Sequence, residues 1–208
     1  MADDSRVPIP TLTRLATYYK ILGEAQVRGV HNLNSAQIEA ECGISAAQFR
    51  KDLSHFGEMG KPGVGYEVAK LRARIATILH LDRTQRFALI GAGRLGQALA
   101  AYPGLNDYSF ELTALFDTDK KKIGRRVNGI EIEDADGIPN RMRELNLKIA
   151  VLTVPGSEAQ KASDAAIKGG ARWILNFTPA HVRVPENCMV RDIVFTQEFA
   201  VLAHYIEE

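Results

Sequence analysis

The glycine-rich loop near the middle of the chain restricts the fold more than any other feature of the sequence. It follows a short apolar run at residues 87–90 and opens a helical pattern that stops near Pro103. A strand, a glycine turn and a helix in this order are typical of a parallel α/β sheet that holds a nucleotide diphosphate at the helix start. The loop residues expected to bind the cofactor are Gly91, Ala92, Gly93, Arg94, Leu95 and Gly96.

Asp117 directly follows a second apolar run, residues 112–116. It lies about 20 residues after the last glycine of the loop. A carboxylate at this place accepts hydrogen bonds from an adenosine ribose and repels the 2′-phosphate of NADP. We therefore expect NADH and NAD as ligands, with NADPH bound more weakly. The basic run at residues 120–126 is interpreted as a solvated face, with a phosphate pocket as the alternative.

Two further apolar runs end in residues that can border the same ligand. Residues 149–154 run into one proline and residues 173–177 run towards another. Because the carboxyl ends of parallel strands meet at one edge of a sheet, both ends are expected beside the cofactor, on the nicotinamide side. The candidate residues there are Thr153, Val154, Pro155, Asn176 and Pro179.

The amino-terminal region predicts a helix at about residues 11–22. Apolar side chains recur there at helical spacing, with Thr11 as the expected cap. Arg14 and Tyr18 are expected to lie off the apolar stripe.

A helix-turn-helix pattern follows at residues 34–56. Asn34 and Gln37 form a capping-box pair at the first helix, Gly43 ends it, and Ser45 caps the second. The second helix is expected to bury one apolar face, formed by Ala46, Phe49, Leu53 and Phe56.

The other side of this second helix presents polar side chains that suit base edges and phosphates. Asp52 is expected on this exposed side and is interpreted as an orienting partner for a neighbouring cation. After the helix, residues 61–66 read as a basic wing able to approach phosphates, with a plain solvated hairpin as the alternative. The candidate DNA-binding residues are Ser45, Gln48, Arg50, Lys51, Ser54, His55, Lys61, Gly63 and Tyr66.

Length and composition indicate two small domains. Of the 208 residues, 46% are hydrophobic and 25% charged, which is typical of globular proteins. The periodicity changes from helical to strand-like after the polar stretch 82–86, so we expect a winged-helix DNA-binding domain over 1–84 and a Rossmann domain over 85–208. The net charge is only +1, but basic residues outnumber acidic ones between residues 45 and 75.

Other function classes find little support in the sequence. The apolar runs are too short for a membrane span, and the acidic amino terminus does not read as a secretory signal, so a cytoplasmic protein is expected. Cys42 and Cys188 are interpreted as small hydrophobes. We expect no catalytic residues and no metal site.

Residues 196–206 form an apolar helical pattern on nearly every side. A terminal helix of this kind would expose half of its apolar surface on a monomer. Burial between two subunits is the natural remedy, and a two-fold dimer is also what a helix-turn-helix protein needs to read a palindrome.

Several stretches, in this order, closely resemble the Rex family of redox-sensing transcriptional repressors. They are residues 49–57, the wing 63–66, the glycine loop with Arg94, residues 102–104 and residues 153–155. The resemblance runs from about residue 9 to the carboxyl end. It implies a homodimer with winged-helix and Rossmann domains and with carboxyl-terminal helices exchanged between subunits.

The resemblance also implies a function. Such repressors bind palindromic operator DNA and release it when NADH rises relative to NAD, so that NADH and NAD are effectors and no hydride is transferred. The loop glycines and Arg94 would hold the diphosphate, Asp117 the ribose, and Phe195 of the partner subunit would lie near the nicotinamide. Arg14 and Tyr102 match positions of the network that links the domains.

One residue departs from the family pattern. Where the family usually carries an acidic residue before the terminal helix, this chain has Val194. Valine cannot pair with Arg14, so either Asp192 or Glu198 takes its place or the coupling between ligand and DNA differs.

Two other functions remain open from the residues alone. An NAD-dependent dehydrogenase would need a substrate domain and a general acid or base, for which His181 and His204 are poor candidates. A DNA-binding regulator could instead respond to CoA or another adenine nucleotide, because glycine loops of this type are shared.

Overall fold

The computed structural model describes residues 7–57, 59, 60 and 64–206, and the chain divides into two compact units, residues 1–83 and 84–208. The sequence places this boundary one residue later. Lys61 and Gly63, two of the candidate DNA-binding residues, lie outside the described residues.

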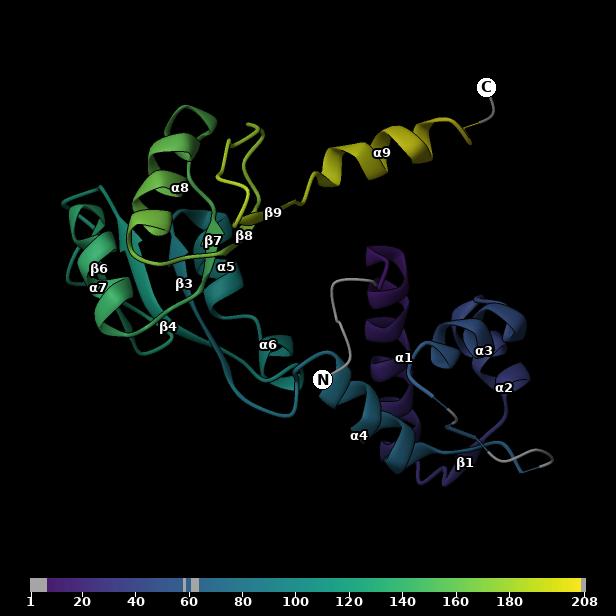
Figure 1. The fold of residues 1–208 in the computed structure, drawn as a ribbon. Coiled ribbons are helices and arrows are strands. Elements are labelled where there is room, and N and C mark those ends of the chain that lie inside the picture. The colour runs from purple at the N-terminus through teal and green to yellow at the C-terminus, as the bar shows by residue number, and fades with distance from the viewer. Residues whose placement is uncertain (1–6, 58, 61–63, 207–208) are drawn as a thin grey trace. The chain divides into compact units, whose positions relative to one another are not determined.

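The first unit is a helical domain with a small two-stranded sheet (Figure 1). Its elements are α1 (Ile9–Val27), β1 (Asn32–Leu33), α2 (Ser35–Cys42), α3 (Ala46–Ser54), β2 (Tyr66–Glu67) and α4 (Val68–Ile78). Helix α1 packs against α4, and α2 packs against α3. β1 and β2, one on either side of the helix-turn-helix, pair antiparallel with Leu33 opposite Tyr66. This order of elements is that of a winged helix.

The caps of α2 and α3 confirm the predicted helix-turn-helix. The Gln37 N–H donates to the Asn34 side chain and the Asn34 N–H donates to the Gln37 side chain, which makes a complete capping box. Gly43 ends α2 with a φ of 69°, a conformation that favours glycine. Ser45 caps α3 by accepting the Gln48 N–H over 3.2 Å.

Helix α1 begins earlier than the sequence indicates. It starts at Ile9 with Pro8 in the cap position, and proline is well suited to a helix start because its missing N–H would have no partner there. Thr11 therefore lies inside the helix and is buried, and its expected capping role is wrong. Tyr18, expected off the apolar stripe, is fully buried as well.

The second unit is a seven-stranded sheet with helices on both faces. Its strands are β3 (Gln85–Ile90), β4 (Phe110–Asp117), β5 (Arg126–Val127), β6 (Ile130–Asp134), β7 (Ile149–Leu152), β8 (Trp173–Asn176) and β9 (Met189–Asp192). Its helices are α5 (Arg94–Ala100), α6 (Gly104–Asp107), α7 (Ile138–Glu144), α8 (Ala159–Lys168) and α9 (Phe195–Ala203), with short 3₁₀ turns at Ala135–Gly137 and Gly156–Glu158.

The strand order is β5-β6-β4-β3-β7-β8-β9, and only the β5–β6 pair is antiparallel. From β3 the chain first builds the sheet towards β4 and β6, and then crosses back to add β7 and β8 on the other side. Such a reversal opens a crevice at the carboxyl ends of the two strands where it occurs, here β3 and β7. The fold is therefore the expected Rossmann-like α/β domain, and the reversal marks its ligand edge.

Two apolar cores cover the sheet, one on each face. Side chains alternate along β3, so that Ala88 and Ile90 join the core beneath α7 and α8 while Phe87 and Leu89 join the core on the α5 side. Figure 1 shows α7 and α8 on the face opposite to α5. This sandwich holds the ends of β3 and β4 rigidly at the ligand edge.

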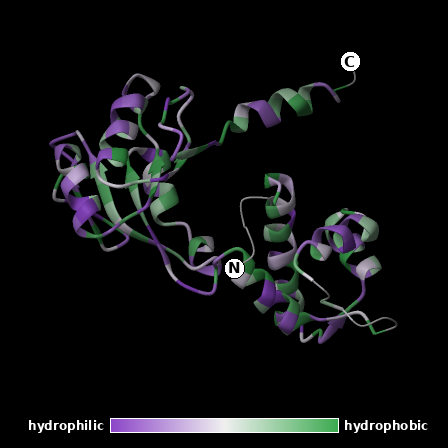
Figure 2. Cartoon of the chain, viewed as in Figure 1, coloured by the Kyte–Doolittle hydropathy of each residue, from purple (hydrophilic) through white to green (hydrophobic). Residues whose placement is uncertain are grey.

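Helix α9 has no buried residue within one chain. Its exposed hydrophobic side chains, together with those just after it, are Phe195, Phe199, Val201, Leu202, Tyr205 and Ile206. Figure 2 shows hydrophobic positions alternating with hydrophilic ones along α9. None of the helices in the described part of the chain is long and apolar enough to cross a membrane.

Candidate functional site

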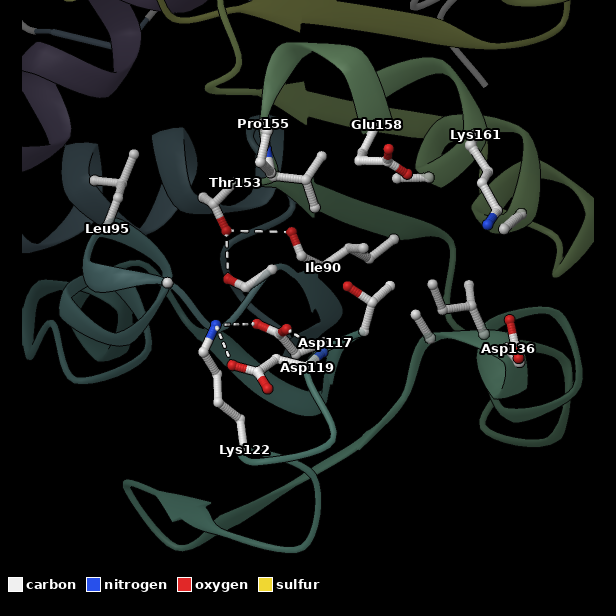
Figure 3. A pocket seen from close by; sticks show the side chains of 18 of the residues that line it. Ile90, Leu95, Asp117, Asp119, Lys122, Asp136, Thr153, Pro155, Glu158 and Lys161 are labelled. Carbon is white, nitrogen blue, oxygen red and sulfur yellow. Dashed lines mark hydrogen bonds and ion pairs between the residues drawn. The ribbon is translucent and has the colours of Figure 1, made fainter.

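A pocket of about 530 Å³ opens at the carboxyl edge of the second unit's sheet (Figure 3). It lies over the reversal point, where the loops after β3, β4 and β7 meet. This size is in the usual range for small-ligand sites. The lining residues are Ile90, Gly91, Gly93, Arg94, Leu95, Asp117, Thr118, Asp119, Lys122, Ala135, Asp136, Ile138, Thr153, Val154, Pro155, Glu158, Lys161, Ala162 and Ala165.

The loop glycines fit a nucleotide for reasons of space. Gly91 has a φ of 107°, and a Cβ there would lie 2.7 Å from the Thr153 carbonyl oxygen. A Cβ on Gly96 would overlap the carbonyl oxygen of Gly91, so α5 can approach β3 only without a side chain at this position. A Cβ on Gly93 would meet nothing within 4 Å, so the backbone there borders open space. The loop is thus tight on its protein side and bare on its pocket side, as a bound diphosphate requires.

Thr153 holds the glycine loop against β7. Its hydroxyl donates to the Gly91 carbonyl oxygen over 2.7 Å and lies 3.2 Å from that of Ile90. The side chain points into the pocket region of Figure 3, yet its donor is already used by the loop. Thr153 therefore shapes the site, and Val154 and Pro155 line it beside Thr153.

Asp117 lies at the end of β4, is only 9% exposed and still borders the pocket. Its Oδ2 accepts the Ala92 N–H over 2.8 Å and the Lys122 ammonium over 2.9 Å, and its Oδ1 accepts the Asp119 N–H over 2.8 Å. Burial by itself would raise the pKa of Asp117, but these donors outweigh it and lower the pKa below its usual value. The carboxylate is therefore ionised at neutral pH and borders the pocket.

Several pocket residues were not identified from the sequence. Lys122 belongs to the run interpreted as a solvated face, but its side chain folds back onto Asp117. Asp136, Glu158 and Lys161 line the far end of the pocket in Figure 3. These residues reach the pocket only because the fold brings α8 and two 3₁₀ turns together there, so no local sequence pattern signals their place.

Five expected cofactor residues do not line the pocket within one chain, namely Ala92, Gly96, Asn176, Pro179 and Phe195. Ala92 and Gly96 are buried in the glycine loop and at the start of α5. Asn176 is fully buried, and its amide nitrogen donates to the Ala180 carbonyl oxygen and to Asp192, while its oxygen accepts the Thr178 N–H. Pro179 is exposed, and Phe195 begins α9, where its side chain is 59% exposed. Asn176 therefore braces the loop after β8.

The exposed side of α3 carries most of the candidate DNA-binding side chains. Arg50 is exposed and donates to the Ser35 hydroxyl of α2 over 2.8 Å. Lys51 and His55 are exposed, and the Ser54 hydroxyl donates to the Lys51 carbonyl oxygen. Ser45 remains exposed although its hydroxyl caps the helix. Arg50 and Lys51 are the two exposed cations of α3.

Asp52 corrects the sequence interpretation of this helix. It was placed on the exposed side, but it is 1% exposed and faces α1. Arg14 Nε and Nη2 donate to its two oxygens, each over 2.6 Å, and the Tyr18 hydroxyl donates over 2.9 Å. Gln48 donates to the same carboxylate over 2.8 Å. The orienting role for a cation is present, but the cation is Arg14.

Tyr66 also has a packing contact that the sequence does not predict. It lies in β2, and its ring packs edge-on against Phe49 with 5.1 Å between centroids. The ring is half-buried there. Its contribution to the wing is therefore to anchor the end of the hairpin on α3.

Comparison with known proteins accounts for both halves of the chain. Residues 82–180 match a family described as "CoA binding domain", and residues 6–54 match one described as "Putative DNA-binding protein N-terminus". The redox-sensing transcriptional repressor Rex of Thermus thermophilus is 44% identical over 91% of this chain and 89% of its own length. The Rex of Syntrophomonas wolfei is 38% identical over 97% and 96%. The chain belongs to the Rex family.

Solved structures of a Rex-family repressor share the whole fold. RSP in complex with β-NAD⁺ and operator DNA has a TM-score of 0.90 at 29% identity, covering 95% of this chain and 91% of its own. RSP in complex with β-NADH has a TM-score of 0.87 at 28% identity, covering 96% and 93%. The similarity therefore extends over both units of this Rex-family chain.

The residues expected to couple the two domains of this Rex-family protein have different surroundings. Arg14 is engaged by Asp52, as described above, whereas Tyr102 follows α5 and is 60% exposed. Asp192, considered as a substitute for the missing acid at Val194, is bound by Asn176 and by His181, whose Nδ1 lies 3.1 Å from its Oδ2. Glu198 is exposed on α9. Within one chain, Arg14 and Asp192 each have other partners.

Proposed function

We propose that this protein represses transcription by binding operator DNA as a homodimer, and that it leaves the DNA when NADH rises relative to NAD. The observation that carries the proposal is the match of both units to RSP in its complexes with β-NAD⁺ and operator DNA and with β-NADH. The pocket at the glycine loop and the basic face of α3 supply this chain with a site for each ligand.

The pocket residues divide the dinucleotide among themselves by chemistry. The bare backbone of Gly93 and the start of α5 suit the diphosphate, with Arg94 as the nearby cation. Asp117 suits the adenosine ribose because its ionised carboxylate accepts hydroxyl donors. Thr153, Val154 and Pro155 border the opposite side of the loop, nearest the expected nicotinamide.

The DNA contacts are assigned to the exposed cations of α3. Arg50 and Lys51 can reach a base edge and a phosphate, because α3 is the second helix of the helix-turn-helix. Its hydrogen bond to Ser35 leaves Arg50 fixed over α2 in the free protein. A two-fold dimer would place two such helices on successive half-sites of a palindrome.

Helix α9 is proposed as the main dimer contact. Its apolar side chains have no cover within one chain, and exposed patches of this kind mark association surfaces. In a dimer, Phe195 of the partner subunit would complete the nicotinamide side of the pocket, which accounts for its distance from the pocket within one chain.

We propose that the protein transfers no hydride. This is supported by the relatives of the chain, which are named as transcriptional repressors. His181 is 95% exposed and is held by Asp192 outside the pocket. The dinucleotide is then an effector, and a repressor of this kind is expected to act in the cytoplasm.

The proposal is tested with the full-length protein and a duplex that the protein itself selects from a random pool. Fluorescence anisotropy at one fixed salt concentration measures DNA affinity with NADH, NAD⁺, NADPH or CoA added, since salt alone changes DNA affinity strongly. We expect NADH to weaken DNA binding and NAD⁺ to leave it strong. Release by CoA, with no response to NADH, would favour the adenine-nucleotide alternative that the "CoA binding domain" match keeps in view.

A further inference from the structure

Lys122 occupies an unusual place at the ribose end of the pocket. Its Nζ lies 2.9 Å from Asp117 Oδ2 and 4.0 Å from Asp119 Oδ2, and all three side chains line the pocket. Figure 3 shows the ammonium between the two carboxylates. The side chain is 31% exposed, so it is fixed at the tip and solvated along part of its stem.

The hydrogen bonds of Asp117 leave little room for a ribose. A carboxylate offers about four acceptor sites. Three are filled, by the N–H groups of Ala92 and Asp119 and by the Lys122 ammonium. A ribose diol that donates two hydrogen bonds to Asp117 needs two sites, so one of the present donors has to leave.

The donor that can leave is Lys122. The Ala92 and Asp119 N–H groups belong to the backbone of the turns after β3 and β4, and their positions follow from the sheet. Lys122 sits on a flexible four-carbon stem and already has a second carboxylate, Asp119, within reach. Release from Asp117 leaves the ammonium beside the ribose 2′ position.

We propose that Lys122 sets the pocket's discrimination between dinucleotides with and without a 2′-phosphate. The ammonium competes with the ribose hydroxyls of NADH for Asp117, and it offers a partner to the 2′-phosphate of NADPH. Lys122 thus lowers the affinity for NADH and raises the affinity for NADPH. It therefore narrows the preference for NADH that Asp117 alone would impose. This inference rests on the proposed nucleotide function.

The test is calorimetric titration of the full-length protein with NADH and with NADPH, in the parent and in Lys122→Met. Methionine keeps the length of the stem and removes the charge. We expect NADH affinity to rise roughly two- to fivefold, the worth of a partly exposed ion pair. NADPH affinity should fall about tenfold, the worth of one charge-assisted hydrogen bond to phosphate.

Lys121→Met is the matched control. It removes the same charge one residue away, from an exposed side chain that does not line the pocket. Both affinities should stay within about twofold of the parent, because exposed charges are well screened. Lys122→Arg should keep NADPH binding near the parent value.

The outcomes distinguish failure of the proposed nucleotide function from failure of the role proposed for Lys122. If the parent binds neither dinucleotide, the proposed function fails. If the parent binds NADH but Lys122→Met changes both affinities in the same direction, or neither, Lys122 has only a structural part and the inference fails. Should the methionine variant melt at a lower temperature, Lys122→Gln repeats the test, and a gain in NADH affinity remains the result that a structural defect cannot produce.

Discussion

Asp52 and Asp117 are both nearly buried carboxylates with several donors, but they differ in where those donors come from. Asp52 is bound by side chains only, from Arg14 and Tyr18 on α1 and Gln48 on its own helix. Asp117 is bound by two backbone N–H groups and one lysine. The first carboxylate joins helices, and the second shapes the turns around a pocket.

The difference shows how a structural carboxylate is told from a binding one. Asp52 has four close donors, so its acceptor sites are filled, and it does not line the pocket at the glycine loop. Asp117 has one free acceptor site, its donor Lys122 can be replaced, and it borders the pocket. Burial alone would raise the pKa of both carboxyl groups. In each case the hydrogen-bond donors lower it by more, so that the net pKa lies below its usual value. Ionisation alone therefore does not separate them, whereas the spare acceptor capacity does.

The largest effect is expected from Asp52→Ala. It leaves the buried Tyr18 hydroxyl and the part-buried Arg14 guanidinium without their acceptor, which costs about 2 to 3 kcal/mol of unfolding free energy. Urea unfolding at fixed protein concentration, with hydrogen exchange of α1 and α3, measures the loss in the first unit. NADH affinity should stay within about twofold of the parent because the nucleotide pocket lies in the other unit. A variant as stable as the parent would remove Asp52 from its structural role.

Arg50→Ala and Lys51→Ala test the exposed side of α3, in contrast to the buried Asp52 on the same helix. Both side chains are exposed, so stability should change by less than about 0.5 kcal/mol. Loss of a base contact should cost about 1 to 3 kcal/mol of DNA binding and relax sequence preference. Loss of a phosphate contact should weaken binding to every duplex and lower the salt slope by about one. Parent-like DNA binding by both variants would show that α3 is not the recognition helix.

Asp117→Ala is the reverse of Asp52→Ala, because it should impair binding more than folding. We expect NADH affinity to fall about tenfold, since hydrogen bonds to a charged acceptor are lost. NADPH affinity should fall less, because the repulsion of its 2′-phosphate is also removed, and the gap between the two ligands should narrow. Calorimetry on parent and variant measures both. If Asp117→Ala lowered the affinities for NADH and NADPH by the same factor, or changed neither, the assignment of Asp117 would be contradicted.

The contrast between the two carboxylates also marks what could be predicted from the sequence. Asp117 was identified because it directly follows a buried strand at a fixed distance from the glycine loop, and both signals are local. The capping box of Asn34 and Gln37 was identified for the same reason. Each pattern is complete within a few residues of one element.

The parts that were missed depend on distant pairing. Asp52 is separated from Arg14 by 38 residues, so helical spacing left it on a polar side that α1 in fact covers. The sequence indicates that Lys122 is one of several solvated cations. In the structure, the turn after β4 places it against Asp117. Asn176 ends its strand as expected, but its amide is used by the loop that follows. Local patterns predict the elements and leave their partners undetermined.

The smallest effect concerns communication between the two units, through Arg14. Coupling between an effector and DNA is typically 5- to 150-fold, and it must be the same whether NADH weakens DNA binding or DNA weakens NADH binding. We expect a value at the low end, because the Val194 side chain cannot accept a hydrogen bond and Arg14 is held by Asp52.

Val194→Asp supplies an acceptor that competes for Arg14, and the coupling should rise by up to about fivefold, the limit for an ion pair that has to displace an existing one. Val194→Asn is the matched control, since it adds polarity of the same size without charge and should give a smaller rise. NADH affinity measured with and without the selected duplex gives the coupling in each variant. If Val194→Asp leaves it unchanged, Arg14 serves the Asp52 cluster alone, and the two carboxylate sites communicate by another route.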